Sequence, residues 1–321
     1  MSGLLRVLTA LACAAVCVLA QAQGYPAKTV RLVYPIAAGG GIDALVRTVS
    51  QRLSEALGQP VVVENKPGAG GIVGTEYVAR SAPDGYTLLV SSPTLVISPI
   101  LYSKLPYDPF KDFAPITQLI AMNQVVVVNS TLHVKNLREL IDLAKTKPGV
   151  LNYASFGIGS SAHLVMEMFQ AMAGIKLNHV PYKGGAQALA DVIAGQVQIT
   201  YGTFGVMSSQ WKAGKVRVLA VDGARRLAQY PDVPTVAETL PGFESTSWIG
   251  LLAPAGTPRE AINRITAEVR KILTDPAFRE KSMDLQGLEP IVSSPEQFAE
   301  YIKSEALKWS KVVRDAKVAL D

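Results

Sequence analysis

Short runs of β-branched residues alternate with helical segments along most of the chain, and this alternation limits the possible folds more than any other feature. Residues 30–35, 61–63 and 86–90 have the composition of buried strands. Between the first two of them, residues 45–57 place apolar side chains on one face at helical spacing. A strand–helix–strand–helix–strand pattern favours an α/β fold, in which a largely parallel sheet carries helices on both faces.

The same alternation restarts near Gln124 and continues to Val221. Residues 231–243 hold three prolines and are expected to form an irregular connection. Trp248–Leu252 is predicted to be a further buried strand, and helices are predicted from residue 257 to residue 309.

The late strand decides the domain organisation. If residues 248–252 return to the first sheet, the chain crosses between two lobes twice, near Ile120–Gln124 and near Phe243–Ser247. Two crossings make a hinge, and a cleft between lobes is a favoured ligand site. The sequence therefore predicts two α/β lobes, each a mixed sheet flanked by helices: residues 23–121 plus 246–321, and residues 122–245.

Residues 1–22 are typical of a cleavable export signal. Arg6 supplies the positive charge, and Val7–Ala20 is apolar apart from Thr9, which is too short for the roughly 20 residues of a membrane span. Small residues at Ala20 and Ala22 suit signal peptidase. We predict cleavage after Ala22 and a periplasmic protein; lipid attachment at Cys13 is the alternative.

The composition excludes several classes of function. The chain has 31 Lys and Arg against 26 Asp and Glu, without a basic run, which argues against nucleic-acid binding. Two cysteines and three histidines are too few for a Cys/His metal cluster. Both cysteines fall in the predicted signal, and the 49% apolar content suffices for a core without disulfides.

Glycine-rich turns follow four predicted strands. In open α/β sheets, ligands bind at the carboxyl ends of strands, where such turns lead into helices. The unpaired N–H groups and the helix dipole there hold anions without a charged side chain. The repetition, two turns in each half, indicates a cleft that grips carboxylate groups. The turns are Gly39-Gly40-Gly41, Gly68-Ala69-Gly70-Gly71, residues 157–161 and Lys183-Gly184-Gly185.

Polar side chains beside these turns have two interpretations each. Asp43 either caps the following helix or contacts the ligand. Lys183 either lies free on the surface or meets an anion. The same choice between a structural role and a ligand contact applies to Ser91, Ser92, Thr94, Ser160, Ser161, His163 and Thr203.

Enzyme motifs are absent from the sequence. Gly157-x-Gly159-x-x-Ala162 matches the dinucleotide fingerprint, but no acidic residue ends the next predicted strand. There is no Gly-x-Ser-x-Gly, P-loop or His-Glu-x-x-His motif, and no motif pairs a serine with His133, His163 or His179. The sequence therefore favours binding over catalysis, with no cofactor and no metal.

Six segments resemble the Bug family, the extracytoplasmic solute receptors of tripartite tricarboxylate transporters. They occur in order over essentially the whole chain after the predicted signal. One departure is Ala37-Ala38, where the family often has Ala or Gly followed by Pro. The segments are VRLVYPIAAGGGID (30–43), VVVENKPGAGG (61–71), APDGYTLL (82–89), SFGIGSSAHL (155–164), VPYKGG (180–185) and DVPTVAE (232–238).

The resemblance implies a type II periplasmic-binding-protein fold that closes on a small organic acid, such as a di- or tricarboxylate, an acidic amino acid or an aromatic acid. It also implies membrane transporter subunits as partners, and we expect the receptor to be a monomer. Together with the turns, it predicts the following ligand-binding residues: Ala38, Gly39, Gly40, Asp43, Ser91, Ser92, Thr94, Ser155, Gly157, Gly159, Ser160, Ser161, His163, Tyr182, Lys183, Gly184 and Thr203.

Four aromatic residues are candidate walls for the rest of the ligand: Tyr34, Phe156, Tyr182 and Phe204, of which Tyr34 and Phe156 could equally belong to the core. Two other functions remain open at this point. One is a carboxylate-binding protein that feeds a signalling receptor, and the other is an exported α/β hydrolase.

Overall fold

The computed structural model describes residues 24–39 and 41–316. The predicted export signal and Gly40, one of the predicted site residues, lie outside the described residues. The elements follow one another in this order: β1 (Val30–Tyr34), α2 (Gly41–Leu57), β2 (Val61–Asn65), η1 (Ala69–Gly71), α3 (Ile72–Ala79), β3 (Thr87–Ser91), α4 (Thr94–Leu101), β4 (Phe113–Met122), β5 (Gln124–Asn129), α5 (Leu137–Thr146), β6 (Asn152–Ser155), α6 (Ser161–Ala173), β7 (Asn178–Pro181), α7 (Gly185–Ile193), β8 (Ile199–Thr203), α8 (Phe204–Lys212), β9 (Val216–Val221), α9 (Val236–Thr239), β10 (Ser247–Pro254), α10 (Arg259–Thr274), α11 (Pro276–Ser282), η2 (Asp284–Gln286), β11 (Leu288–Pro290) and α12 (Pro295–Ala316).

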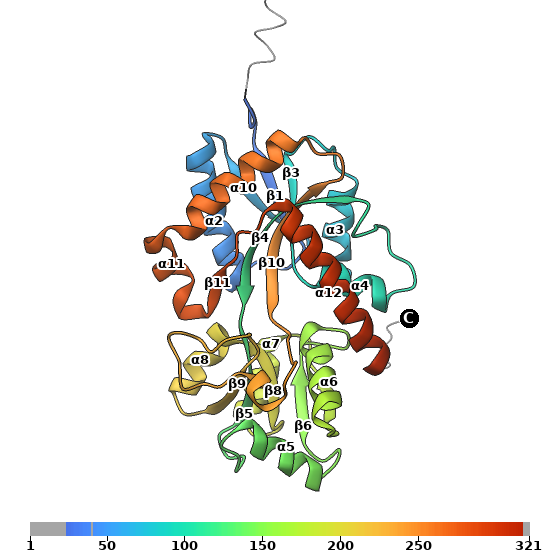
Figure 1. Cartoon of the computed structure of the whole chain (residues 1–321), viewed down its shortest axis with the longest axis vertical. Coiled ribbons are helices and arrows are strands. Elements are labelled where there is room, and N and C mark those ends of the chain that lie inside the picture. Colours follow the sequence, from blue (N-terminus) through green and yellow to red (C-terminus); the bar gives the residue numbers. More distant parts are fainter. Residues whose placement is uncertain (1–23, 40, 317–321) are drawn as a thin grey trace, which may run out of the picture.

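The strands form two separate mixed sheets, one in each lobe (Figure 1). The first has the order β11-β4-β10-β3-β1-β2, and the second has the order β7-β6-β8-β5-β9. The predicted return strand is confirmed, because β10 lies between β3 and β4 and pairs antiparallel with both. The chain passes from the first sheet to the second at Asn123, between β4 and β5, and returns before Ser247. The lobe boundaries given above stay a prediction.

Strand direction decides which loops face the other lobe. β4 ends at the first crossing, and β1, β2 and β3 run parallel to it, because β10 is antiparallel to both β3 and β4. In the second sheet, β5 begins at the crossing and is antiparallel to β8, which runs parallel to β6 and β7. The carboxyl ends of β1, β2, β3, β6, β7 and β8 therefore all lie at the junction of the two lobes.

Two helix starts that the sequence predicts are confirmed by their caps. The Asn136 side chain accepts a hydrogen bond from Glu139 N–H at 2.9 Å at the start of α5. At the start of α12, Gln297 N–H donates to Ser294 Oγ, and Ser294 N–H donates to the Gln297 side chain. Within the part of the chain that the structure describes, no helix is both long and apolar enough to cross a membrane.

Four elements were not predicted: β4, α4, α9 and the three-residue strand β11, which lies in a stretch expected to be helical. Prolines or neighbouring turn residues explain the first three. β4 carries Pro115, which weakens the strand pattern, yet the strand pairs with β10 along most of its length. α4 contains Pro99 and begins at Thr94, which the sequence places in a loop. The stretch predicted to be irregular holds the short α9, where Thr235 and Glu238 form a reciprocal capping box.

The last helix connects the lobes. α12 runs from the first lobe towards the second and packs against α6 (Figure 1). The buried Glu305 carboxylate accepts hydrogen bonds from the indole N–H groups of Trp248 at 3.3 Å and Trp309 at 3.1 Å. One apolar cluster therefore contains residues of both sheets together with α6 and α12.

Gly250 on β10 leaves room for the Phe298 ring of α12, and a Cβ atom there would overlap that ring. We expect Gly250→Ala to lower the free energy of unfolding by about 1–3 kcal/mol, because an overpacked core forces the ring or the strand to move. Urea denaturation measures the change. Phe298→Leu in the same chain should recover part of the loss, and Gly24→Ala, which meets no neighbour, is the neutral control. Equal stability of Gly250→Ala and the unmodified protein would contradict this packing.

Candidate functional site

Helix N-termini from both lobes converge on the junction. α2, α3 and α4 follow the parallel strands of the first sheet, and α6, α7 and α8 follow those of the second. No side chain caps the first turns of α3, α4, α7 and α8. The positive dipole ends of these helices therefore lie at the junction, which is a suitable environment for an anion. Backbone carbonyls already accept hydrogen bonds from several of the first-turn N–H groups, among them those of Ile72, Val96 and Phe204.

In the first lobe, Asp43 organises the loop after β1. Its carboxylate accepts hydrogen bonds from Gly39 N–H at 3.2 Å, from Arg47 Nε at 3.0 Å and from Asn65 Nδ2 at 2.9 Å. Asn65 also donates to Ile36 O at 3.0 Å, which ties the same loop to the end of β2. The Asp43 side chain is thus occupied by the protein, and it shapes the loop from within the first turn of α2.

Asp43 is ionised in this arrangement. Burial alone would raise its pKa, but the hydrogen bonds from Asn65, Arg47 and Gly39 outweigh burial and hold the pKa below the usual range. Sequence reasoning missed Arg47 and Asn65. The spacing of four residues between Asp43 and Arg47 on one helix face was a usable signal, whereas the contact with Asn65 depends on strand pairing.

In the second lobe, the loop after β6 folds back on itself. Gly157, at a φ of 122°, donates its N–H to Ser155 Oγ, and its carbonyl accepts from Ser155 Oγ and Ser160 Oγ. Gly159 N–H donates to His163 Nδ1 at 3.1 Å. Ser160 caps α6 by accepting from His163 N–H.

These contacts change which backbone groups are available to a ligand. The N–H groups of Gly157 and Gly159 are used by the protein itself. Among the hydrogen bonds of the described residues, none uses the N–H groups of Ile158, Ser161 or Ala162. The second-lobe loop therefore has free backbone donors, and they lie beside the two glycines.

The structure pairs a serine with a histidine, which no sequence motif indicated. Ser155 Oγ and His179 Nε2 are hydrogen bonded at 2.6 Å, because β6 and β7 pair in parallel with Tyr153 opposite His179. Ser155 is fully buried and also bonds Gly157. The pair supports a loop and lacks the exposed hydroxyl that a nucleophile needs.

The loop after β3 brings Ser92 and Thr94 together. Their hydroxyls lie 3.0 Å apart, and Thr94 is exposed at the first residue of α4. Ser91 is buried at the end of β3, where it pairs with Gly250. Of the predicted residues in this loop, Ser92 and Thr94 are therefore the ones open to the junction edge.

The remaining predicted residues of the second lobe differ in how exposed they are and in whether the protein itself binds their side chains. The Tyr182 hydroxyl donates to Asp191 at 2.6 Å, so this side chain is anchored to α7. Lys183 is exposed and forms no ion pair within the described part of the chain, next to Gly184 at the uncapped start of α7. Thr203 is half-buried at the start of α8 and pairs with Gln124.

Two of the four candidate aromatic walls are core residues. Tyr34 is 3% exposed, and Phe204 is fully buried against Trp211 and Tyr230. Phe156 is half-buried and packs near Gly185 and Gly202. The sequence predicts Phe204 as a cleft wall, and this is wrong because the first turn of α8 directs its side chain into the second-lobe core.

A buried carboxylate joins the two crossings of the hinge. Asp222, at the end of β9, accepts hydrogen bonds from Gln124 N–H at 2.8 Å on the first crossing and from Ser245 Oγ at 3.3 Å on the second. The Tyr201 hydroxyl donates to the same carboxylate. Burial raises the pKa of Asp222 to about 6, although these hydrogen bonds oppose the rise.

No group of three or more His, Cys, Asp or Glu side chains that could hold a metal occurs in the described ranges 24–39 and 41–316.

Comparisons with known proteins agree on one family. The family model described as the tripartite tricarboxylate transporter family receptor matches residues 45–318. The UPF0065 protein in the tcbD-tcbE intergenic region of Pseudomonas sp. is 36% identical over 97% of this chain and 94% of its own length. Protein BugT of Bordetella pertussis is 35% identical over 92% of this chain and 91% of its own.

Solved structures are similar over nearly the whole chain. A protein of R. palustris solved with adipate is 34% identical, covers 92% of this chain and 99% of its own, and has a TM-score of 0.83. MatC from Rhodopseudomonas palustris with bound malate is 31% identical, with coverages of 90% and 100% and a TM-score of 0.77. The periplasmic binding protein BugD is 33% identical, with coverages of 92% and 99% and a TM-score of 0.79.

The hinge carboxylate leads to a pH-dependent prediction. The pKa of Asp222 is higher in the folded protein than the ordinary value of about 3.9, so its contribution to stability is fully present below pH 4 and is lost as the pH rises through 6. Relative to Asp222→Asn, the unmodified protein should lose on the order of 2 kcal/mol of stability between pH 4.5 and pH 7.5, as measured by urea denaturation.

Asp43→Asn is the matched control for this titration. The pKa of Asp43 is lowered, so its titration lies below pH 4 and its effect should be constant over the same range. A stability difference between Asp222→Asn and the unmodified protein that does not change with pH would show that Asp222 is not the titrating group.

Proposed function

The chain belongs to the tripartite tricarboxylate transporter receptor family, and we propose that it captures a small organic dicarboxylate between its lobes and delivers it to a membrane transporter. The proteins of this family and the solved structures that resemble the chain are solute-binding receptors, and the chain shares their two-lobed α/β fold. The periplasm is the proposed site of action. A single chain supplies both halves of the site, so we propose that it acts as a monomer.

One observation carries the proposal that the ligand is an anion with two charged ends. Helix N-termini whose first turns have no side-chain cap lie at the junction edge of both sheets. A carboxylate gains charge-assisted hydrogen bonds at such a terminus. Two sets of donors on opposite lobes suit a molecule with a carboxylate at each end, because each lobe then holds one end and the ligand itself links the lobes.

The named ligands of the relatives support this chemical class. One similar structure contains adipate and another contains malate, and both acids carry two carboxylates. The two proteins resemble this chain over at least 90% of its length. We therefore propose the aliphatic dicarboxylates first, from four to six carbons long.

Thermal unfolding with a ligand panel tests the proposal. Succinate, malate and adipate would each be added to protein freed of bound ligand by unfolding and refolding, with monomethyl adipate as the matched control. A dicarboxylate at 100 times its Kd should stabilise the protein by about 2.7 kcal/mol, which raises the melting temperature by several degrees. The monoester should bind roughly tenfold weaker or worse, because it loses charge-assisted bonds at one end. No shift with any of the three acids would contradict the proposal.

A proline substitution tests the second-lobe contact directly. Ser161 is the first residue of α6, where proline is well tolerated, and the Ser160 ψ of 157° suits a following proline. Ser161→Pro removes an N–H that the protein does not use, so the Kd for adipate should rise roughly tenfold while the melting temperature of the free protein stays near its original value. Ser161→Ala keeps the N–H and should stay within roughly threefold. Equal affinities of the two variants would exclude this contact.

A further inference from the structure

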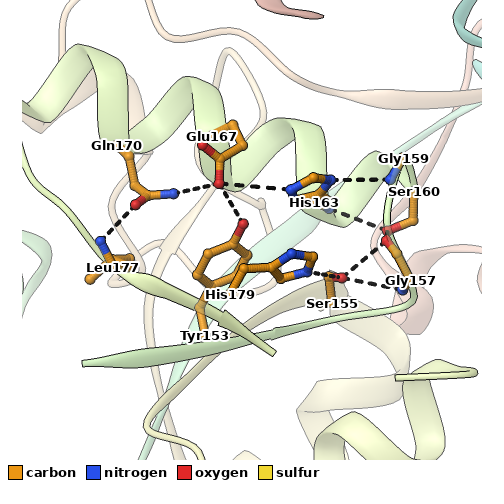
Figure 2. Close-up of polar contacts among 10 residues, drawn as sticks. All are labelled: Tyr153, Ser155, Gly157, Gly159, Ser160, His163, Glu167, Gln170, Leu177 and His179. Atoms are coloured by element: carbon orange, nitrogen blue, oxygen red, sulfur yellow. Dashed lines mark hydrogen bonds and ion pairs between the residues drawn. The ribbon is translucent and has the colours of Figure 1, made fainter. Parts of the chain in front are cut away.

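A polar network of side chains from β6, α6 and β7 contacts the second-lobe loop (Figure 2). The rings of His163 on α6 and His179 on β7 stack with their centroids 4.1 Å apart and their planes 9° apart. Tyr153 on β6 stacks on His179 at 4.8 Å and 16°. Ligand capture as proposed above makes no use of these three buried or half-buried rings.

Each histidine reaches one glycine of the loop through a different ring nitrogen (Figure 2). His163 Nδ1 accepts the hydrogen bond from Gly159 N–H. His179 Nε2 bonds Ser155 Oγ, which in turn bonds both the N–H and the carbonyl of Gly157. Because the single proton of Ser155 goes to the Gly157 carbonyl, the bond to His179 forms when Nε2 carries the proton and donates it.

Glu167 decides which nitrogen of the His163 ring carries the proton, because it lies on the Nε2 side of the ring, opposite Gly159 (Figure 2). Its carboxylate accepts from Tyr153 OH at 2.6 Å and from Gln170 Nε2 at 2.8 Å, and it lies 3.8 Å from His163 Nε2. The proton of the neutral ring is favoured on the nitrogen nearest a carboxylate, so Nδ1 is left free to accept from Gly159. Gln170 also accepts from Leu177 N–H, which ties α6 to the segment before β7.

Both histidines are neutral near pH 7, and the bond from Gly159 to His163 requires this state. Burial lowers the pKa of His163 more than Glu167 raises it. Burial and the neighbouring His163 lower the pKa of His179 to about 4. A cationic ring would put a proton on both nitrogens, and His163 Nδ1 could then no longer accept from Gly159.

We propose that His163 and His179 are positioning residues of the ligand site, which hold Gly159 and Gly157 through Nδ1 and Nε2 respectively, so that the N–H groups of Ile158, Ser161 and Ala162 stay free to bind the ligand. This inference rests on the proposed function. Without the two ring contacts, Gly159 N–H loses its partner, and Ser155, which holds Gly157, loses its bond to His179. The loop is then free to turn its donors away from the ligand. We expect loss of these contacts to weaken ligand binding more than it destabilises the fold, because Ser160 still caps α6.

The two different nitrogens allow a crossed rescue experiment. An Asn side-chain oxygen reaches about where Nδ1 lies, and a Gln amide reaches about where Nε2 lies, so each histidine has one matching amide and one mismatched amide. His163→Asn and His179→Gln should bind adipate within roughly twofold of the unmodified protein, whereas His163→Gln and His179→Asn should bind it roughly tenfold weaker. A role in packing alone would not produce opposite preferences for Asn and Gln at the two positions.

Amide hydrogen exchange of the ligand-free protein separates this inference from the proposed function. Gly159 N–H should exchange roughly tenfold faster in His163→Gln than in His163→Asn. If adipate and malate fail to bind the unmodified protein but exchange follows this order, the proposed function fails and the positioning role stands. Equal exchange and equal affinity in the matched and mismatched variants would overturn the positioning role.

Ser155→Ala provides a second test if the mismatched variants do not fold. It removes one buried oxygen with little change in volume and breaks the link from His179 to Gly157. We expect faster exchange at Gly157 and a roughly tenfold loss of adipate affinity, with circular dichroism unchanged. Unchanged exchange at Gly157 would contradict the inference.

Discussion

The antiparallel placement of β10 between β3 and β4 is the constraint on which the site depends. It makes β4 run in the same direction as β1, β2 and β3, so the edge where the chain leaves the first lobe is also the edge where its helices begin. The second sheet repeats the arrangement, because β5 starts at the crossing and runs opposite to β8. The same strand directions therefore produce both the hinge and the two opposed sets of helix N-termini.

Side chains at the junction mainly hold the backbone, and the backbone provides the donors. Asp43 fixes the loop after β1, and Ser155, Ser160 and the two stacked histidines fix the loop after β6. This division of roles explains why a search for catalytic motifs fails on this chain. It also explains why the net charge of +5 says little about the site, since the helix N-termini contribute no formal charge.

Periodicity and turn residues were enough to predict the α/β class, the two lobes and the return of β10, because each depends on a local pattern or on strand count. The missed elements carry misleading local signals: Pro115 lies inside β4 and Pro99 inside α4. The side-chain contacts at the site could not be predicted from the sequence for a different reason. The contact between Ser155 and His179 depends on the register of β6 with β7. The contact between Asp43 and Asn65 depends on the register of β1 with β2. Neither register can be read from one sequence.

The proposed carboxylate ligand would meet carboxylates of the protein itself near the junction. Asp43, Glu167 and Asp222 all lie near the junction loops or the hinge, and each could repel an anion at short range. Each is surrounded by donors: Asp43 by Arg47, Asn65 and Gly39; Glu167 by Tyr153 and Gln170; Asp222 by Gln124, Tyr201 and Ser245. The three carboxylates thereby hold the loops and the hinge in place, and in the proposed function an incoming anion meets the positive ends of the helices.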